Sequence, residues 1–297
     1  MKKMLCLLVC SVLVSTAVAD PDGVVKALDT FVPKGALQEE QAFGDYVIRT
    51  YRKGSGSFEI LRNGERVYAE HGYVFRVGSK YKFGETNSPV SIGTDITGDG
   101  QPNLVVSEWT GGAHCCYLFN IFEIGPTFRH IQTINATHSD DAEFRNCDDD
   151  PDLEFVMEDW TFAYWDGCFA GSPSPKVILK YNGERYEIAT ELMRKPPMTE
   201  EKLAELAHET RISSSWRVRG EPDEGWYDKP SSDVWEQMLD LIYSGNLDQA
   251  WDFFYLAWNH DWERDMKQKT NDTFLRAFMK QLKMSPFWDD VRKMSGY

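Results

Sequence analysis

The sequence lacks the short motifs that identify the common catalytic classes. It contains no G-x-S-x-G, no P-loop, no G-x-G-x-x-G and no H-E-x-x-H. Nothing in it therefore points to a serine-hydrolase elbow, a nucleotide-binding loop or a zinc-peptidase helix. After residue 19 it also lacks any apolar run long enough to cross a membrane, so we expect no membrane insertion of the mature chain.

Basic residues are scarce relative to acidic ones. The chain has 32 Lys and Arg against 47 Asp and Glu, a net charge of −15. Loss of Lys2 and Lys3 with the leader described next would take the charge to −17. Such a charge repels nucleic acids and anionic membranes, so we expect neither as a partner. It is compatible with cations and with a protein or envelope partner.

The first nineteen residues have the pattern of a cleavable secretory signal. Two lysines precede an apolar core over residues 5–14, and Ala17-Val18-Ala19 is a small-x-small cleavage site. We expect cleavage before Asp20 and a periplasmic or secreted location in a bacterium. The alternative, an uncleaved anchor, is disfavoured because this core is short for a bilayer.

Only four cysteines remain after that cleavage. An even number in an exported chain favours two disulfides, with three possible pairings. Adjacent cysteines would point to opposite faces of a strand, so each bridges to a distant cysteine or the two close a vicinal ring. Zinc ligation is less favoured because adjacent thiols do not have C-x₂-C spacing. The disulfide candidates are Cys115, Cys116, Cys147 and Cys168.

Short β-branched and aromatic segments alternate with Gly, Asn and Asp turns from residue 46 to residue 188. This pattern predicts an all-β unit, with hairpin turns at Asn63-Gly64 and Asn182-Gly183. Residues 20–40 show no strand pattern and predict a helical or irregular lead-in. The predicted strands cover 46–51, 58–62, 66–68, 73–77, 104–109, 117–124, 128–134, 153–160, 177–181 and 186–188.

Beyond Pro196-Pro197 the pattern becomes helical. The predicted helices cover 200–210, 232–243, 247–258, 272–283 and 287–294. We therefore expect an α+β protein in which a repeat-built antiparallel β domain, propeller-like or sandwich-like, spans residues 20–191. A small all-α domain follows over residues 192–297.

Residues 95–110 recur, with an offset of 51, as residues 146–161. Oxygen-bearing side chains occupy the first, third, fifth and ninth positions of both copies, and an apolar strand follows at once. Ca²⁺ takes six to eight oxygens, and a tight loop supplies them from alternate residues with a backbone carbonyl at the seventh position. The candidate ligands are Asp95, Thr97, Asp99, the Gln101 carbonyl and Asn103 in the first copy, and Asn146, Asp148, Asp150, the Asp152 carbonyl and Glu154 in the second.

The repeat resembles the FG-GAP/VCBS class of β-propeller repeats, whose blades carry a D-x-D/N-G-D-G-x-x-D/E loop before a strand. Residues 111–116, GGAHCC, are similar to a family of exported bacterial proteins. The resemblance implies Ca²⁺ binding and a β architecture and implies no enzymatic activity.

Both copies depart from that pattern. The first has only two carboxylates among its ligand positions, which predicts weak affinity. The second has Asp149 and Pro151 where the pattern has glycines, and proline cannot take a positive φ, so this loop must be shaped differently. The alternative for both copies is a metal-free Asx turn.

The function expected from these observations is that of a non-enzymatic, exported binding or scaffold protein with Ca²⁺-binding, Asp-rich loops. No residue is assigned as catalytic. The alternative is a periplasmic hydrolase acting on envelope material, with a pocket around His114, Trp109 and the Asp-rich loops.

Overall fold

The computed structural model describes residues 28–78, 90–165, 167–214, 230–258 and 264–297. Within them the chain forms three antiparallel sheets followed by a group of helices, so the predicted α+β class is confirmed. The predicted signal segment 1–19 lies outside the described residues. Among the helices that are described, none is both long enough and apolar enough to cross a membrane.

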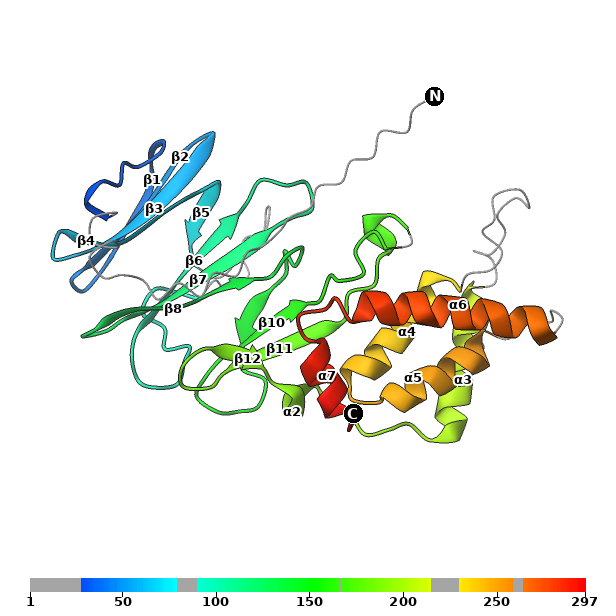
Figure 1. Ribbon diagram of the computed structural model, residues 1–297. Coiled ribbons are helices and arrows are strands. Elements are labelled where there is room, and N and C mark those ends of the chain that lie inside the picture. The colour runs from blue at the N-terminus through cyan, green and yellow to red at the C-terminus, as the bar shows by residue number, and fades with distance from the viewer. Residues whose placement is uncertain (1–27, 79–89, 166, 215–229, 259–263) are drawn as a thin grey trace, which may run out of the picture.

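Each sheet is a meander of four strands that are consecutive in the sequence. Figure 1 shows the three sheets one after another, with the helices beside the third. Sheet A contains β1 (Ala36–Phe43), β2 (Tyr46–Lys53), β3 (Ser55–Arg62) and β4 (Glu65–Gly72). Sheet B contains β5 (Val74–Val77), β6 (Asn103–Trp109), β7 (Tyr117–Ile124) and β8 (Phe128–Asn135). Sheet C contains β9 (Glu143–Arg145), β10 (Glu154–Glu158), β11 (Lys176–Tyr181) and β12 (Tyr186–Ile188).

The hairpin predicted at Asn63-Gly64 is confirmed. Both residues have positive φ, 50° and 83°, and Arg62 pairs with Glu65 across the two-residue loop. Positive φ at both central positions is the requirement of a type I′ turn. By contrast, the irregular or helical lead-in expected over residues 20–40 is wrong from residue 36, where β1 begins. This edge strand pairs with β2 alone and is largely exposed, so it carries little of the apolar alternation that identifies a strand.

Sheet B is covered on both faces, because successive side chains of a strand point to opposite sides of a sheet. In β6, Val106 belongs to the core shared with sheet A, whereas its neighbour Val105 belongs to the core shared with sheet C. In β7, the ring of Phe119 lies 4.9 Å from that of Phe155 in sheet C. Residues 103–108 are therefore buried without a break.

Six α-helices follow the sheets in the part of the chain that is described. They are α2 (Thr190–Met193), α3 (Glu200–Ser214), α4 (Ser232–Tyr243), α5 (Leu247–Ala257), α6 (Arg264–Leu282) and α7 (Trp288–Met294). Gly245, with φ of 82°, lies in the short link between α4 and α5 and lets the chain reverse there. A short 3₁₀ helix, η1 (Phe169–Gly171), lies between β10 and β11.

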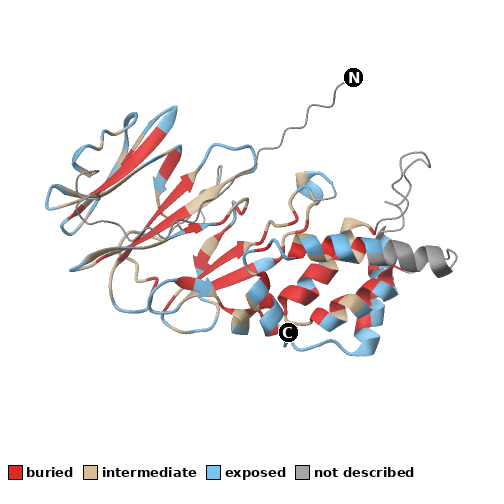
Figure 2. Cartoon of the chain, viewed as in Figure 1, coloured by how far each residue is buried: buried red, intermediate tan, exposed pale blue. Residues whose placement is uncertain are grey.

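The change from strands to helices falls between Ile188 and Thr190, but the hydrophobic core does not divide there. The buried side chains of sheet C and those of the helices belong to one cluster, and Figure 2 shows buried segments both in the strands of sheet C and in the helices beside it. Phe162, which follows β10, lies 5.7 Å from the ring of Trp235 on α4 and 5.0 Å from that of Phe278 on α6.

One buried carboxylate links the sheets to the helices. Asp159 Oδ1 accepts hydrogen bonds from the backbone N–H and the hydroxyl of Thr161, at 2.8 and 2.6 Å. Its Oδ2 accepts from the hydroxyls of Tyr243 at the end of α4 and Ser285 after α6, both at 2.5 Å. A buried carboxylate is tolerated only when it is fully hydrogen-bonded, and these bonds hold two helices to sheet C.

We expect Asp159→Ala to destabilise the fold by about 3 kcal/mol, because it leaves buried hydroxyls without an acceptor. Tyr243→Phe removes one donor and should cost about 1 kcal/mol. Asp289→Ala, at a side chain that is 78% exposed, should change the unfolding free energy by less than about 0.5 kcal/mol. Urea unfolding of the three variants measures this order, and an Asp159→Ala protein as stable as Asp289→Ala would refute the linking role.

Glu108 occupies the position of Asp159 in the first repeat copy and is also buried. It has a poorer environment, since its Oε1 accepts one hydrogen bond from the N–H of Tyr73, at 2.9 Å. Burial raises the pKa of Glu108 above its ordinary value of 4.5; the bond from Tyr73 opposes this rise and the charge of Glu70 adds to it.

Because its pKa is raised in the folded state, ionised Glu108 destabilises the fold as the pH rises through that pKa. Glu108→Gln keeps the acceptor for Tyr73 and removes the charge. We expect the variant to melt at a higher temperature than the wild type at pH 7, with the difference vanishing below about pH 4.5. Equal melting temperatures at both pH values would contradict this account.

Candidate metal centre

The two Asp-rich segments occupy the same place in two neighbouring sheets. Loop one, residues 95–103, leads directly into the second strand of sheet B, and loop two, residues 146–154, leads directly into the second strand of sheet C. In both, the ninth loop residue is the first residue of the following strand.

The first turn of each loop is closed by the same hydrogen bond. In loop one the N–H of Gly98, at position four, donates to Asp95 Oδ1, at position one, over 2.8 Å. In loop two the N–H of Asp149 donates to Asn146 Oδ1 over 2.7 Å. A side-chain oxygen that accepts from a backbone N–H a few residues on is the bond of an Asx-type turn.

A second shared bond closes the whole loop. The N–H of Ile96, at position two, donates to Asn103 Oδ1, at position nine, over 2.9 Å. The N–H of Cys147 donates to Glu154 Oε2 over 2.7 Å. The two copies therefore share local geometry as well as sequence, because in each loop the side chain at position nine accepts a hydrogen bond from the N–H at position two.

The two loops differ in conformation and hydrogen bonding at position six. Position four has positive φ in both, 69° at Gly98 and 65° at Asp149, so an aspartate here adopts the conformation that favours glycine. At position six, Gly100 has φ of 80° and its N–H donates to Asp95 Oδ2 over 2.8 Å. Pro151 has no N–H to donate, so the difference expected from the sequence occurs at this position.

Four carboxylates of loop two converge on one point, and a lysine side chain reaches that point. The carboxylate quartet, which we define as Asp148, Asp150, Asp152 and Glu154, offers four oxygens that all lie within 4.8 Å of one another. The ammonium nitrogen of Lys180, on β11, lies 2.7, 2.5, 3.3 and 2.9 Å from the four residues in that order.

The spacing of these oxygens fits a bound cation. Oxygens that share one Ca²⁺ at about 2.4 Å can be at most about 4.8 Å apart, and Mg²⁺ at about 2.0–2.1 Å demands a smaller sphere. Glu154 is fully buried and Asp152 nearly so, while Asp148 and Asp150 are more exposed, so the quartet is closed on one side and open to solvent on the other. The residues present can therefore bind a metal ion.

The charges of the quartet are only partly compensated. Hydrogen bonds with Asp152 and Lys180 hold the pKa of Asp150 at about 2. Burial and the contact with Asp150 raise the pKa of Asp152 to about 6. Burial alone would lower the pKa of Lys180, but its hydrogen bonds to the quartet raise that pKa well above its ordinary value. The ammonium is thus fully charged, and one positive charge faces up to four negative ones.

Two residues of the ligand set predicted for loop two, Asn146 and Asp152, lie as follows. Asn146 does not join the quartet: its amide donates to the Asp150 carbonyl and its oxygen accepts from Asp149. Asp152 joins with its side-chain carboxylate rather than its backbone carbonyl. Lys180 could not be predicted from the loop, because the residue comes from another strand and the loop spacing contains no information about it.

Loop one assembles a smaller group of oxygens. The Thr97 hydroxyl lies 3.3 Å from Asp95 Oδ1 and 3.2 Å from Asn103 Oδ1, so these three predicted ligands meet. Asp99 instead accepts a hydrogen bond from the N–H of Gln101 at 2.9 Å, which closes a turn. These bonds are those of a self-contained Asx-type loop.

The two loops also lie against each other. The carbonyl of Ile96 in loop one accepts a hydrogen bond from the N–H of Leu153 in loop two, at 3.0 Å, and another from the Tyr186 hydroxyl, at 2.9 Å. A side chain at Gly98 would come within 3.0 Å of the Asp152 backbone nitrogen, so glycine is needed there for close approach as well as for its φ. Loop one therefore supports the loop that carries the quartet.

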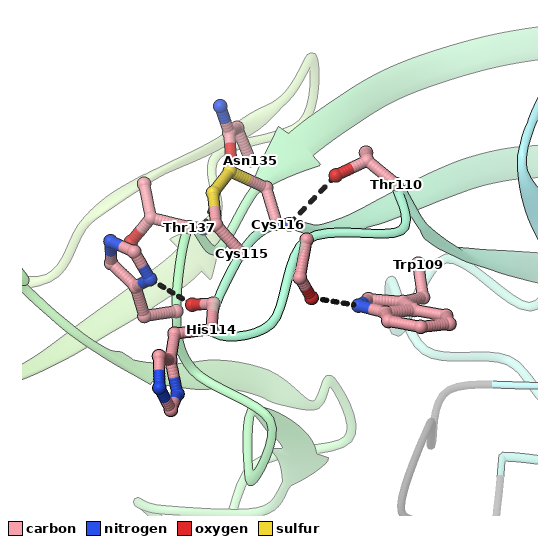
Figure 3. Close-up of a disulfide and its surroundings, with 9 residues drawn as sticks. Trp109, Thr110, His114, Cys115, Cys116, Asn135 and Thr137 are labelled. Carbon is pink, nitrogen blue, oxygen red and sulfur yellow. Dashed lines mark hydrogen bonds between the residues drawn. A yellow bond between two sulfur atoms is a disulfide. The ribbon is translucent and has the colours of Figure 1, made fainter. Parts of the chain in front are cut away.

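Of the two disulfides expected, the structure contains one within its described residues. Cys115 and Cys116 form a vicinal disulfide, which is one of the alternatives that the sequence left open (Figure 3). The N–H of Cys116 donates to the Thr110 hydroxyl at 2.7 Å. Cys147 is a partly buried free thiol and Cys168 an exposed one, so these two do not pair.

The residues suggested for a hydrolase site are not arranged as a catalytic pair. The ring of His114 stacks on that of Phe169 at 4.3 Å. The Trp109 indole donates to the Gly112 carbonyl at 3.0 Å and lies apart from the His114 ring (Figure 3). The His138 ring contacts the His114 backbone carbonyl. Within the described part of the chain, no hydrogen bond joins the His114 ring to a hydroxyl or carboxylate.

No protein-family model, curated protein or solved structure matches the chain. The resemblance to FG-GAP/VCBS repeats therefore stays a prediction, and the chemistry of the site is argued from its own geometry.

We expect Asp95→Ala to lower the unfolding free energy by about 1–2 kcal/mol even in EDTA, because it removes the acceptor of the Gly98 and Gly100 N–H groups. Asp99→Ala, which removes one exposed bond, should cost less. Chemical denaturation in EDTA compares the two. Equal stability of both variants with the wild type would show that loop one does not depend on its first residue.

Proposed function

We propose that this chain is a non-enzymatic, exported binding or scaffold protein whose β part is stabilised by Ca²⁺ held in loop two. The observation that carries the proposal is the convergence of the carboxylate quartet within 4.8 Å. Four carboxylates at such a distance repel one another, and a bound cation or a proton offsets that repulsion. The local hydrogen bonds that repeat in loop one support a loop shape inherited as a unit rather than a chance cluster.

The ligand chemistry favours calcium among the common divalent ions. All four members of the quartet offer oxygen, and among the residues that the structure describes no thiol or imidazole joins them. Hard oxygen donors suit Ca²⁺, Mg²⁺ or Mn²⁺, whereas zinc sites normally include nitrogen or sulfur. Carboxylates can bind Ca²⁺ through one or both oxygens, so four of them can supply most of its six to eight ligands.

The proposed site would act on the fold rather than on a substrate. The quartet belongs to the segment that leads into β10, and the chain then continues to Asp159, which binds α4 and the residue after α6. An ion in loop two would therefore stiffen the strand on which the helices are held. This arrangement supports a scaffold in which the sheets present loops and the helices dock on them.

Ca²⁺ at about 100 times its dissociation constant should stabilise the protein by about 2.7 kcal/mol, seen as a rise in melting temperature that EDTA reverses. Mg²⁺ should give a smaller rise, because it demands octahedral geometry at shorter distances and gives up its water ligands reluctantly. The double variant Asp148→Ala/Asp150→Ala should lose the response.

The matched control is Asp140→Ala/Asp141→Ala, which removes two exposed carboxylates outside the quartet and should keep the response. Differential scanning fluorimetry of the three proteins measures it. Melting temperatures that change with neither Ca²⁺ nor EDTA would remove the ion from the account of this protein.

A further inference from the structure

Lys180 is placed in loop two by the pairing of β10 with β11. Phe155 pairs with Leu179 in this antiparallel ladder, so the next pair brings Lys180 opposite Glu154. The corresponding pair of sheet B is Asn103 and Glu123. The repeat thus places an acidic residue across from the end of loop one and a basic residue across from the end of loop two.

The ammonium of Lys180 lies where a bound ion would have to lie. It contacts all four members of the quartet within 3.3 Å, and a cation that touched the same four oxygens would have to share this position. Two positive charges do not share one coordination sphere, and both would need the same lone pairs. Three N–H groups also serve four carboxylates, so Asp152, at 3.3 Å, is the least well bound.

The side chain of Lys180 can leave this position. Its ammonium is carried on a flexible four-carbon stem, and the side chain is 24% exposed. A lysine can extend its ammonium into water while its stem stays on the sheet. The quartet, in contrast, is held by the loop hydrogen bonds at Cys147, Asp149 and Asp152.

We propose that Lys180 and a divalent cation are alternative occupants of one position, so that Lys180 keeps loop two closed without metal and limits the affinity of the loop for metal. This inference rests on the proposed function, because it concerns the same quartet. It identifies a residue of β11, outside the loop, as the determinant of metal affinity.

The variant Lys180→Met tests the proposal, because methionine keeps most of the stem and removes the charge. We expect the variant to bind Ca²⁺ at least ~10-fold more tightly than the wild type, since a competitor is lost and no ligand is removed. In EDTA it should melt at a lower temperature than the wild type, because the quartet then has no cation. Lys176→Met changes an exposed lysine of the same strand and should alter neither property.

Isothermal titration with Ca²⁺ and melting in EDTA give outcomes that separate the two proposals. Wild type that binds Ca²⁺ together with Lys180→Met that binds no more tightly would overturn the competition and leave the metal site standing. Absence of binding by both proteins would overturn the metal site and this inference with it.

A second measurement uses the wild-type protein and does not depend on the folding of a variant. Acetylation with an amine-reactive ester, read by mass spectrometry of peptides, reports how accessible each lysine is. We expect Ca²⁺ to increase the labelling of Lys180 several-fold over that in EDTA while the labelling of Lys176 stays constant. Unchanged labelling of Lys180 at a Ca²⁺ concentration that saturates the protein would show that the ammonium does not leave.

Discussion

Repulsion among four carboxylates, and the cation that offsets it, is the constraint on which this part of the structure depends. Asp148, Asp150, Asp152 and Glu154 lie in a stretch of seven residues, and the loop bonds turn all four toward the same point. Glu154 has no exposed surface, so solvent cannot compensate its charge. The ammonium of Lys180 does so, and in reaching the quartet it joins loop two to β11. The register of β10 on β11, the shape of loop two and the balance of its charges therefore all depend on the contact between Lys180 and the quartet.

The repeat conserves geometry between its copies while it changes charge. Both loops use the side chain of position nine to bind the N–H of position two, but that side chain is neutral Asn103 in one and acidic Glu154 in the other. The predicted ligand side chains of loop one are hydrogen-bonded within the loop. Loop one also supports loop two, because its Ile96 carbonyl accepts a hydrogen bond from the N–H of Leu153. Loop two brings four carboxylates together and contains no basic residue that would balance their negative charge. The same pair of closing hydrogen bonds thus shapes one loop that has two carboxylates and one loop that brings four carboxylates together around Lys180.

The same divergence occurs at the far end of each copy. Glu108 and Asp159 are equivalent in sequence and both are buried, yet only Asp159 receives hydroxyl groups from the helices. Sheet B lies between two sheets and has no free face, so Glu108 binds a backbone N–H from the neighbouring Tyr73. Sheet C packs against only one other sheet, and the helices also pack against it. The neighbours of each sheet therefore determine which groups donate hydrogen bonds to the buried carboxylate at this position of the repeat.

The sequence by itself determined the features that arise within a few residues. The spacing of oxygen side chains set the loop bonds, Asn63-Gly64 set a turn that needs positive φ twice, and apolar periodicity set α4 and α5. These follow from steric limits and hydrogen bonds between near neighbours. Only the tertiary structure decided that Lys180 enters the quartet, that Asp152 contributes its side chain, and that Asp159 binds the helices. The Lys180 and Asp159 contacts depend on which strands and helices pack together, and they join residues from 26 to 126 positions apart, where local spacing has no influence.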